Sequence, residues 1–305
     1  MHSARHRALL LWLLLLPLTG CLFRSHKVER RASTAQLKTA TQQELVDIIN
    51  SQAEKMHTLN ATVDIDTSVG GAKKGKVTEY KEIRGYLLVR KPEMLRMVGL
   101  MPIVRNRAFD MVSNGATFKL WIPPKNKFYV GRNDVVRPSA NPLENLRPQI
   151  IYDALLLKPI RLPDEIAVLE GGTEIVMDPK THKEVEQPDY ILNVIHREHG
   201  EWRLDRKIMF SRTDLEPRRA VLFGKEGNIA TDVRYGQFRD YSGVRFPSVL
   251  QITRPQEEYS ITLGVVKMTI NQPLTDQQFA LTQPSSAQMV HLDEPGPRAS
   301  DGQPK

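Results

Sequence analysis

Residues 85–122 decide the fold, and they read GYLLVRKPEMLRMVGLMPIVRNRAFDMVSNGATFKLWI. Apolar and polar side chains alternate with a period of two over Met94–Leu100, Arg107–Ser113 and Thr117–Ile122, as in strands that bury one face. Asn114-Gly115, between two of these runs, is a strong signal for a tight hairpin turn. This stretch therefore predicts consecutive antiparallel strands that are joined by short connections.

The same pattern extends to both sides of this stretch. We expect further strands over 58–66, 81–90, 127–130, 165–169, 190–197, 202–211, 218–223, 229–238, 249–254 and 259–270. Gly171-Gly172 and the polar stretch 178–188 are interpreted as turns between them. An antiparallel sheet of about a dozen strands must curl or close on itself.

Two helices interrupt this pattern of strands. Thr41 and Glu44 form a capping box, and apolar residues follow at helical spacing up to Met56. Pro148 opens a short central helix. The fold class predicted is mainly β (α+β): a curved antiparallel half-barrel with the N-terminal amphipathic helix and the short central helix packed on its concave face.

The N-terminus carries an export signal. A basic start and the apolar run Ala8–Leu16 are followed by Leu18-Thr19-Gly20-Cys21, which looks like a bacterial lipobox. We expect residues 1–20 to be a lipoprotein signal peptide and Cys21 to be acylated. An ordinary signal with an incidental cysteine, or an uncleaved anchor, is the alternative. Residues 21–40 are then a flexible tether, and 293–305 form a disordered tail.

The composition of the 305 residues limits the function classes. A mean hydropathy of −0.38 excludes a multi-span membrane protein, and the single cysteine excludes a disulfide scaffold or a cysteine-cluster zinc site. Cleavage after residue 20 removes two arginines, which leaves 41 Lys+Arg against 35 Asp+Glu, a net charge of +6. For an exported protein this favours an anionic membrane surface over nucleic acid, and a merely soluble surface is equally compatible.

Motifs for catalysis are incomplete. Gly70–Lys76 matches the start of a P-loop, but Val77 replaces the required hydroxyl and a strand follows instead of a helix. His196 and His199 lie at a strand end and are interpreted as turn residues. We therefore expect no catalytic residue, no metal and no cofactor, and no enzyme activity.

The segment Gly99–Val104 is apolar although Gly99 and Pro102 are typical of turns. An exposed apolar loop commonly contacts a membrane or a hydrophobic ligand. Leu100, Met101 and Ile103 are therefore candidates for membrane or acyl-chain contact, and packing in the core is the alternative.

These features resemble the LolA/LolB-like lipoprotein carrier superfamily. The helix over 41–57, the Gly85–Arg96 stretch with its Lys91-Pro92, the hairpin from Ser113 to Pro124, and the closing segment Asn271–Pro284 carry the resemblance. It implies that residues 41–292 form an incomplete barrel around an apolar cavity that takes up acyl chains. Arg96, if it faces that cavity, is a head-group candidate, although an exposed strand arginine is the commoner case.

The resemblance, with Cys21, implies a lipidated acceptor. The expected function is an envelope protein that is anchored to membrane lipid through acylated Cys21 and binds acyl chains or lipoproteins. It is expected at the outer membrane, facing the periplasm, with a periplasmic carrier as a possible partner. The alternative function is a structural or assembly lipoprotein that docks to envelope partners without ligand transfer.

Overall fold

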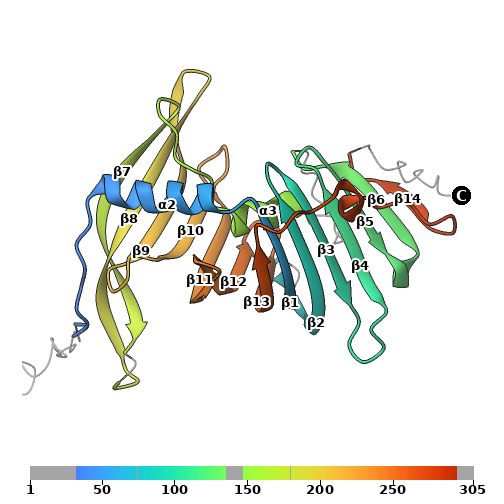
Figure 1. Ribbon diagram of the computed structural model, residues 1–305, viewed down its shortest axis with the longest axis horizontal. Helices are drawn as coiled ribbons and strands as arrows, with labels where there is room; N and C mark the ends of the chain where they lie inside the picture. The colour runs from blue at the N-terminus through green and yellow to red at the C-terminus, as the bar shows by residue number, and fades with distance from the viewer. Residues whose placement is uncertain (1–31, 74, 135–146, 179, 294–305) are drawn as a thin grey trace, which may run out of the picture. The chain divides into compact units, whose positions relative to one another are not determined.

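The computed structural model describes residues 32–73, 75–134, 147–178 and 180–293 (Figure 1). By internal contacts, the chain divides into a small unit, Met1–Thr34 with Glu174–Gln187, and a large unit, Ala35–Thr173 with Pro188–Lys305. Within the described residues the strands form one fourteen-stranded sheet in the order β14-β6-β5-β4-β3-β2-β1-β13-β12-β11-β10-β9-β8-β7. Because β14 and β7 lie at opposite edges and do not pair, the sheet is open.

The strands are β1 (Thr58–Gly71), β2 (Lys76–Arg90), β3 (Met94–Leu100), β4 (Arg107–Ser113), β5 (Thr117–Ile122), β6 (Lys127–Arg132), β7 (Glu165–Met177), β8 (Glu184–Glu198), β9 (Glu201–Ser211), β10 (Pro217–Phe223), β11 (Ile229–Tyr241), β12 (Val244–Arg254), β13 (Tyr259–Ile270) and β14 (Gln288–His291). The helical elements are α2 (Gln42–Lys55), α3 (Pro148–Leu155) and the short 3-10 turns η2 (Pro123–Lys125) and η4 (Asp276–Phe279). No described helix has both the length and the apolar character needed to span a membrane.

The alternation in the sequence gives the sheet one apolar face, which we call the inner face. Leu59, Ala61, Val63 and Ile65 of β1 are buried on it, and Asn60 is exposed on the other face. The same alternation in β2 and β3 extends the inner face across the sheet, because residues paired between neighbouring strands share a face. A continuous core results.

Both helices pack on the inner face. α2 begins at Thr41 with the predicted capping box and buries Leu45 and Ile49 against β8 and β9. α3 buries Ile151 in the central core, and the Tyr235 hydroxyl of β11 donates a hydrogen bond to the Ala154 carbonyl at 3.1 Å. The predicted fold class, a mainly β open sheet with two helices on one face, is therefore confirmed.

The C-terminal segment from Asn271 to Ala287 covers part of the opposite, outer face. Three long side chains that point outward from the strands donate to its carbonyl oxygens: Arg90 to Leu274, Arg96 to Gln278 and Lys119 to Leu281. Asn126, at the end of η2, donates to the Ser286 carbonyl. β14 then pairs with β6 in parallel. This segment closes the outer face over β2–β6.

Some sequence predictions differ from the structure. Gly171-Gly172, interpreted as a turn, lies inside β7; a Cβ on Gly172 would lie 2.3 Å from Asp189, so the glycine permits close contact with β8. In the predicted tether, the Lys38 amide donates to the Arg212 carbonyl at 2.6 Å, so this end is bound to the sheet. Cys21 and the signal peptide lie outside the described residues, as does the tail beyond Asp293.

Candidate functional site: an apolar cavity on the inner face

A cavity of about 250 Å³ lies on the inner face, within the large unit. Strands β1 to β5, β13, η2 and α3 contribute its walls. It is lined by Ile65, Thr67, Tyr80, Ile83, Met97, Ala108, Phe109, Met111, Leu120, Ile122, Pro124, Lys125, Ile151 and Ile261. Most of these side chains are aliphatic or aromatic, so the cavity suits a hydrocarbon chain better than a polar molecule.

Strand register brings these residues together. Ile65 faces Ile83 across β1 and β2, and Met97 faces Met111 across β3 and β4. α3 places Ile151 against the same strands. The cavity is thus a property of the sheet as a whole, built from residues that are far apart in the sequence.

Gly99 makes room for one wall of the cavity. It pairs with Phe109, and a Cβ on Gly99 would lie only 2.3 Å from the Phe109 ring. The register shifts just beyond this pair, which leaves Ala108 as an extra residue in β4. This β-bulge explains how Ala108 and Phe109, consecutive residues, both line the cavity.

The predicted apolar loop is the turn between β3 and β4, next to the Ala108–Phe109 wall. Ile103 is 96% exposed and Met101 is 38% exposed. The Met101 amide donates to the Asn106 carbonyl at 2.7 Å, and the Arg105 amide donates to the Met101 carbonyl at 3.1 Å. Ile103 has φ 67°, a conformation that is unfavourable for a β-branched residue. The turn therefore keeps the Ile103 side chain exposed to water and its backbone in an unfavourable conformation.

Leu100 lies apart from this exposed turn. It is half-buried and lines a shallow hollow of about 360 Å³ on the outer face, together with Tyr86, Leu88 and Val98. Of the three predicted contact residues, Met101 and Ile103 are exposed and Leu100 is half-buried. Their contact with a membrane or an acyl chain stays a prediction.

Arg96 is on the outer face, between the inward-pointing Leu95 and Met97. Its Nε and Nη2 donate to the two carboxylate oxygens of Asp110 at 3.0 and 2.8 Å, and Nη1 donates to the Gln278 carbonyl. Arg96 does not line the inner cavity, and its guanidinium already has partners. A part for Arg96 in head-group binding remains a prediction without a structural basis.

Sequence reasoning did not single out Lys125, the charged residue of the cavity wall. It belongs to Pro123-Pro124-Lys125-Asn126, which the sequence marks only as a turn. The signal that could have found it is the position of this turn directly after β5, whose Leu120 and Ile122 line the cavity.

A polar cleft of about 850 Å³ lies near the opposite end of β3, beside Lys91 and Pro92. Burial, with the nearby Arg161 guanidinium, lowers the pKa of Lys91, whose ammonium donates to the Ala53 carbonyl at the end of α2. The Asn50 side chain both donates to and accepts from the backbone of Ile160, at 3.2 and 2.8 Å. These contacts tie α2 to the sheet and to the chain after α3, and we interpret the cleft as a structural junction.

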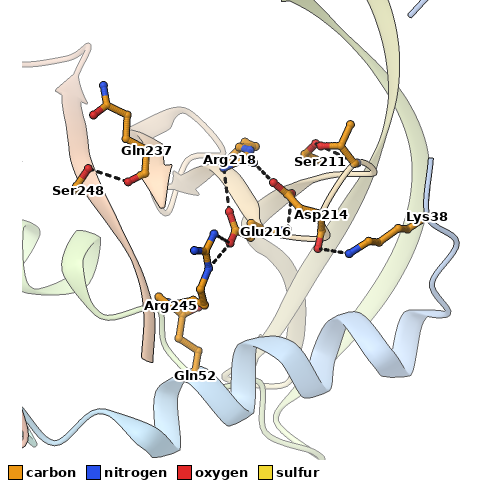
Figure 2. Close-up of polar contacts among 10 residues, drawn as sticks. Lys38, Gln52, Ser211, Asp214, Glu216, Arg218, Gln237, Arg245 and Ser248 are labelled. Carbon is orange, nitrogen blue, oxygen red and sulfur yellow. Dashed lines mark hydrogen bonds and ion pairs between the residues drawn. The ribbon is translucent and has the colours of Figure 1, made fainter. Parts of the chain in front are cut away.

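Figure 2 shows the surroundings of a groove of about 550 Å³ beside α2. Arg218 donates to Glu216 at 3.3 Å and to Asp214, and Arg245 Nε donates to Glu216 at 2.8 Å. Lys38 donates to the Asp214 carbonyl at 3.5 Å. The charged side chains drawn here have partners within the protein.

In the described part of the chain, no three His, Cys, Asp or Glu side chains are grouped so as to hold a metal ion. The cavity on the inner face is the candidate site because its lining is mostly apolar.

No family model matches the chain, and no curated protein matches it. Among solved structures, a DUF1329 family protein from Desulfovibrio piger has a TM-score of 0.50 at 14% identity, with 78% of this chain and 95% of that chain covered. A LolA superfamily protein from Nitrosomonas europaea has 0.48 at 14% identity, with 80% and 99% covered. A putative outer membrane lipoprotein-sorting protein domain from Vibrio parahaemolyticus has 0.47 at 9% identity, with 78% and 97% covered.

At these identities a structural likeness shows the fold alone. The likeness to the Desulfovibrio piger protein, which covers 78% of this chain, is therefore a likeness of overall fold. The open sheet with two helices on one face agrees with the incomplete barrel that the sequence resemblance to the LolA/LolB-like superfamily implies.

Proposed function

We propose that this protein is a lipid-anchored envelope protein that shelters an acyl chain of a lipid or lipoprotein in the cavity on its inner face, without catalysing a reaction. The observation that carries the proposal is the apolar lining of that cavity, which β1 to β5, β13, η2 and α3 build together. Acyl chains are the apolar molecules that a cell envelope supplies in quantity.

The size of the cavity sets the kind of binding expected. About 250 Å³ lies between a cavity of ~150 Å³ that holds benzene and the ~300–1,000 Å³ of pockets for drug-sized ligands. It therefore fits a section of one acyl chain rather than a whole diacyl lipid. Each methylene buried contributes ~0.8 kcal/mol, so the protein would hold a chain moderately and release it to a membrane.

The exposed turn between β3 and β4 supports a membrane-facing role for the same end of the sheet. Met101, Ile103 and Val104 are exposed there, beside the Ala108–Phe109 wall of the cavity. An acyl chain that leaves the cavity at this end would meet the membrane surface that the turn contacts. The lipid anchor at Cys21, inferred from the sequence, would keep the protein near that surface.

The test is binding of a polyene fatty acid whose fluorescence rises in apolar surroundings. The protein is the full-length chain with Cys21→Ser, which removes the acylation site. Ala108→Trp should fill the cavity and weaken binding at least tenfold. Ala116→Trp, on the exposed turn between β4 and β5, is the matched control and should bind like the parent.

Equal binding by Ala108→Trp and Ala116→Trp would overturn the assignment of the cavity. A parent protein that binds no acyl chain, but captures a stoichiometric envelope protein, would support the structural or assembly role instead.

A further inference from the structure

We infer that the cavity selects amphiphiles with an anionic head, a carboxylate or a phosphate, and that Lys125 at its wall binds that head. The inference rests on the proposed function, because it concerns the same cavity, and it adds the ligand class and a residue that determines specificity.

The charge of the lining is the first observation. Among the described residues that line the cavity, Lys125 alone carries a charge, and neither Asp nor Glu is present. No ion pair or hydrogen bond joins its ammonium group to another described residue. An uncompensated cation beside an apolar cavity favours a ligand with a negative charge next to its hydrocarbon part.

The backbone around Lys125 is held in place, which makes its position a fixed feature of the site. Pro123 and Pro124 restrict the turn η2, and the Asn126 amide closes it by donating to the Pro123 carbonyl at 2.9 Å. The Asn126 side chain donates to the Ser286 carbonyl at 2.7 Å, and the Gln288 amide donates to the Asn126 carbonyl at 2.9 Å. The C-terminal segment thus braces the turn that carries Lys125.

The exposure of the lining residues shows where the head would lie. Lys125 is exposed and Tyr80 is 52% exposed, whereas Met97, Met111 and Ile151 are buried. The exposed members mark the opening of the cavity, and the buried ones mark its depth. Thr67 and Tyr80 are paired across β1 and β2 and bring two hydroxyl groups, which can donate to carboxylate or phosphate oxygens.

The sequence makes Arg96 a head-group candidate only if it faces the cavity, and in this inference Lys125 takes that part instead. The Arg96 guanidinium is engaged by Asp110 on the outer face, whereas Lys125 is one of the residues that line the cavity. A lysine is suited to this position because its flexible stem can follow a head group that sits in slightly different places for different chain lengths.

The test compares four ligands on the full-length chain with Cys21→Ser. Palmitate and hexadecyl phosphate carry the two anionic heads, hexadecanol has the same chain with a neutral head, and inorganic phosphate has no chain. Lys125→Gln should weaken the binding of palmitate and of hexadecyl phosphate about tenfold and leave the binding of hexadecanol unchanged. Lys125→Glu should weaken both anions further, and added salt should reduce the difference between parent and variant.

Lys225, on the exposed turn between β10 and β11, provides the matched control, and Lys225→Gln should bind all ligands like the parent. A larger loss for palmitate than for hexadecyl phosphate would identify a carboxylate head, and the reverse a phosphate head. Inorganic phosphate that binds as tightly as hexadecyl phosphate would overturn the inference, because the chain would then contribute nothing.

The inference also fails if Lys125→Gln binds palmitate and hexadecyl phosphate like the parent. It fails likewise if the variant loses as much affinity for hexadecanol as for the two anionic ligands. In that case a loss of binding in Ala108→Trp would leave the proposed function standing. If the parent binds no chain-bearing ligand, the proposed function itself fails.

Discussion

Arg96 and Asp110 form a bidentate ion pair on the outer face, and the Asp110 side chain is completely buried. Arg107 adds a second cation, with 3.2 Å between its Nη1 and the Asp110 carboxylate. Arg96 lies on β3, and Asp110 and Arg107 lie on β4, so the cluster joins the two strands that carry the exposed turn. We interpret it as the anchor that holds this turn and the adjoining cavity wall in place.

Asp110→Asn should therefore destabilise the protein strongly. Loss of the carboxylate leaves two arginines side by side with no counter-charge, and breaking a buried pair in this way costs about 3 kcal/mol. Urea unfolding of the parent and the variant measures the change. Asp134→Asn, which breaks an exposed pair with Arg132, should leave the unfolding midpoint unchanged. An equally small effect at Asp110 would contradict the anchoring role.

Gly99→Ala should disturb the cavity from within the sheet. The new methyl group would collide with the Phe109 ring, which must then move in the cavity wall, and overpacking of this kind costs ~1–3 kcal/mol. We expect acyl-chain affinity to fall several-fold. Gly236→Ala, where a Cβ meets no atom within 4 Å, is the control and should keep both affinity and stability. Unchanged affinity in Gly99→Ala would mean that Phe109 does not shape the site.

Ile103→Asn should raise the stability of the protein and reduce its binding to membranes. Asparagine tolerates the left-handed conformation that isoleucine adopts here, so the free energy of unfolding should rise by ~1 kcal/mol. Binding to phospholipid vesicles, measured by co-sedimentation, should fall because an exposed apolar side chain is lost. Val104→Asn removes a 60% exposed side chain that is not in this conformation, and should reduce vesicle binding without the gain in stability. A destabilised Ile103→Asn would show that the isoleucine packs in the fold.

Asp153, in the polar cleft, should make stability depend on pH. Burial raises the pKa of its carboxyl group, although Lys158 and Gln149 act in the opposite direction. Between the lower pKa of the unfolded chain and the raised pKa of the folded one, the folded protein binds more protons. Its stability therefore decreases as pH rises through that interval, and this contribution is greatest on the acid side.

Asp153→Asn should remove this part of the slope and gain stability relative to the parent towards neutral pH. Urea unfolding at a series of pH values tests this. Asp164→Asn, which changes an exposed residue of the same cleft, should retain the slope of the parent. The prediction is contradicted if the stability of the parent rises with pH over an interval in which the stability of Asp153→Asn does not.

Local patterns were enough to predict much of the fold. The bounds of β3, β4 and β5 follow from alternation and from the turn at Asn114-Gly115, because register and turn chemistry are set by neighbours in the sequence. The capping box at Thr41 likewise fixed the start of α2. The pairing of β14 with β6 was not predicted, since it depends on a segment that returns from more than 150 residues away.

The site was harder to predict than the fold. Alternation does place Arg96 on the opposite face from Leu95 and Met97, so its outward position was available from the sequence. The bulge that turns Ala108 towards the cavity, and the turn that puts Lys125 on its wall, depend on how separate strands meet. Those contacts leave no periodic signal in the chain.

The most direct test of the central claim is where a bound acyl chain lies. Palmitate with a photoreactive diazirine at the end of its chain, irradiated on the full-length protein with Cys21→Ser, labels whatever surrounds the chain end. We predict saturable labelling of peptides that contain Met97, Met111 or Ile151, suppressed by excess palmitate. Labelling confined to the groove beside α2, around Leu215 and Phe238, or labelling that excess palmitate does not suppress, would contradict the account.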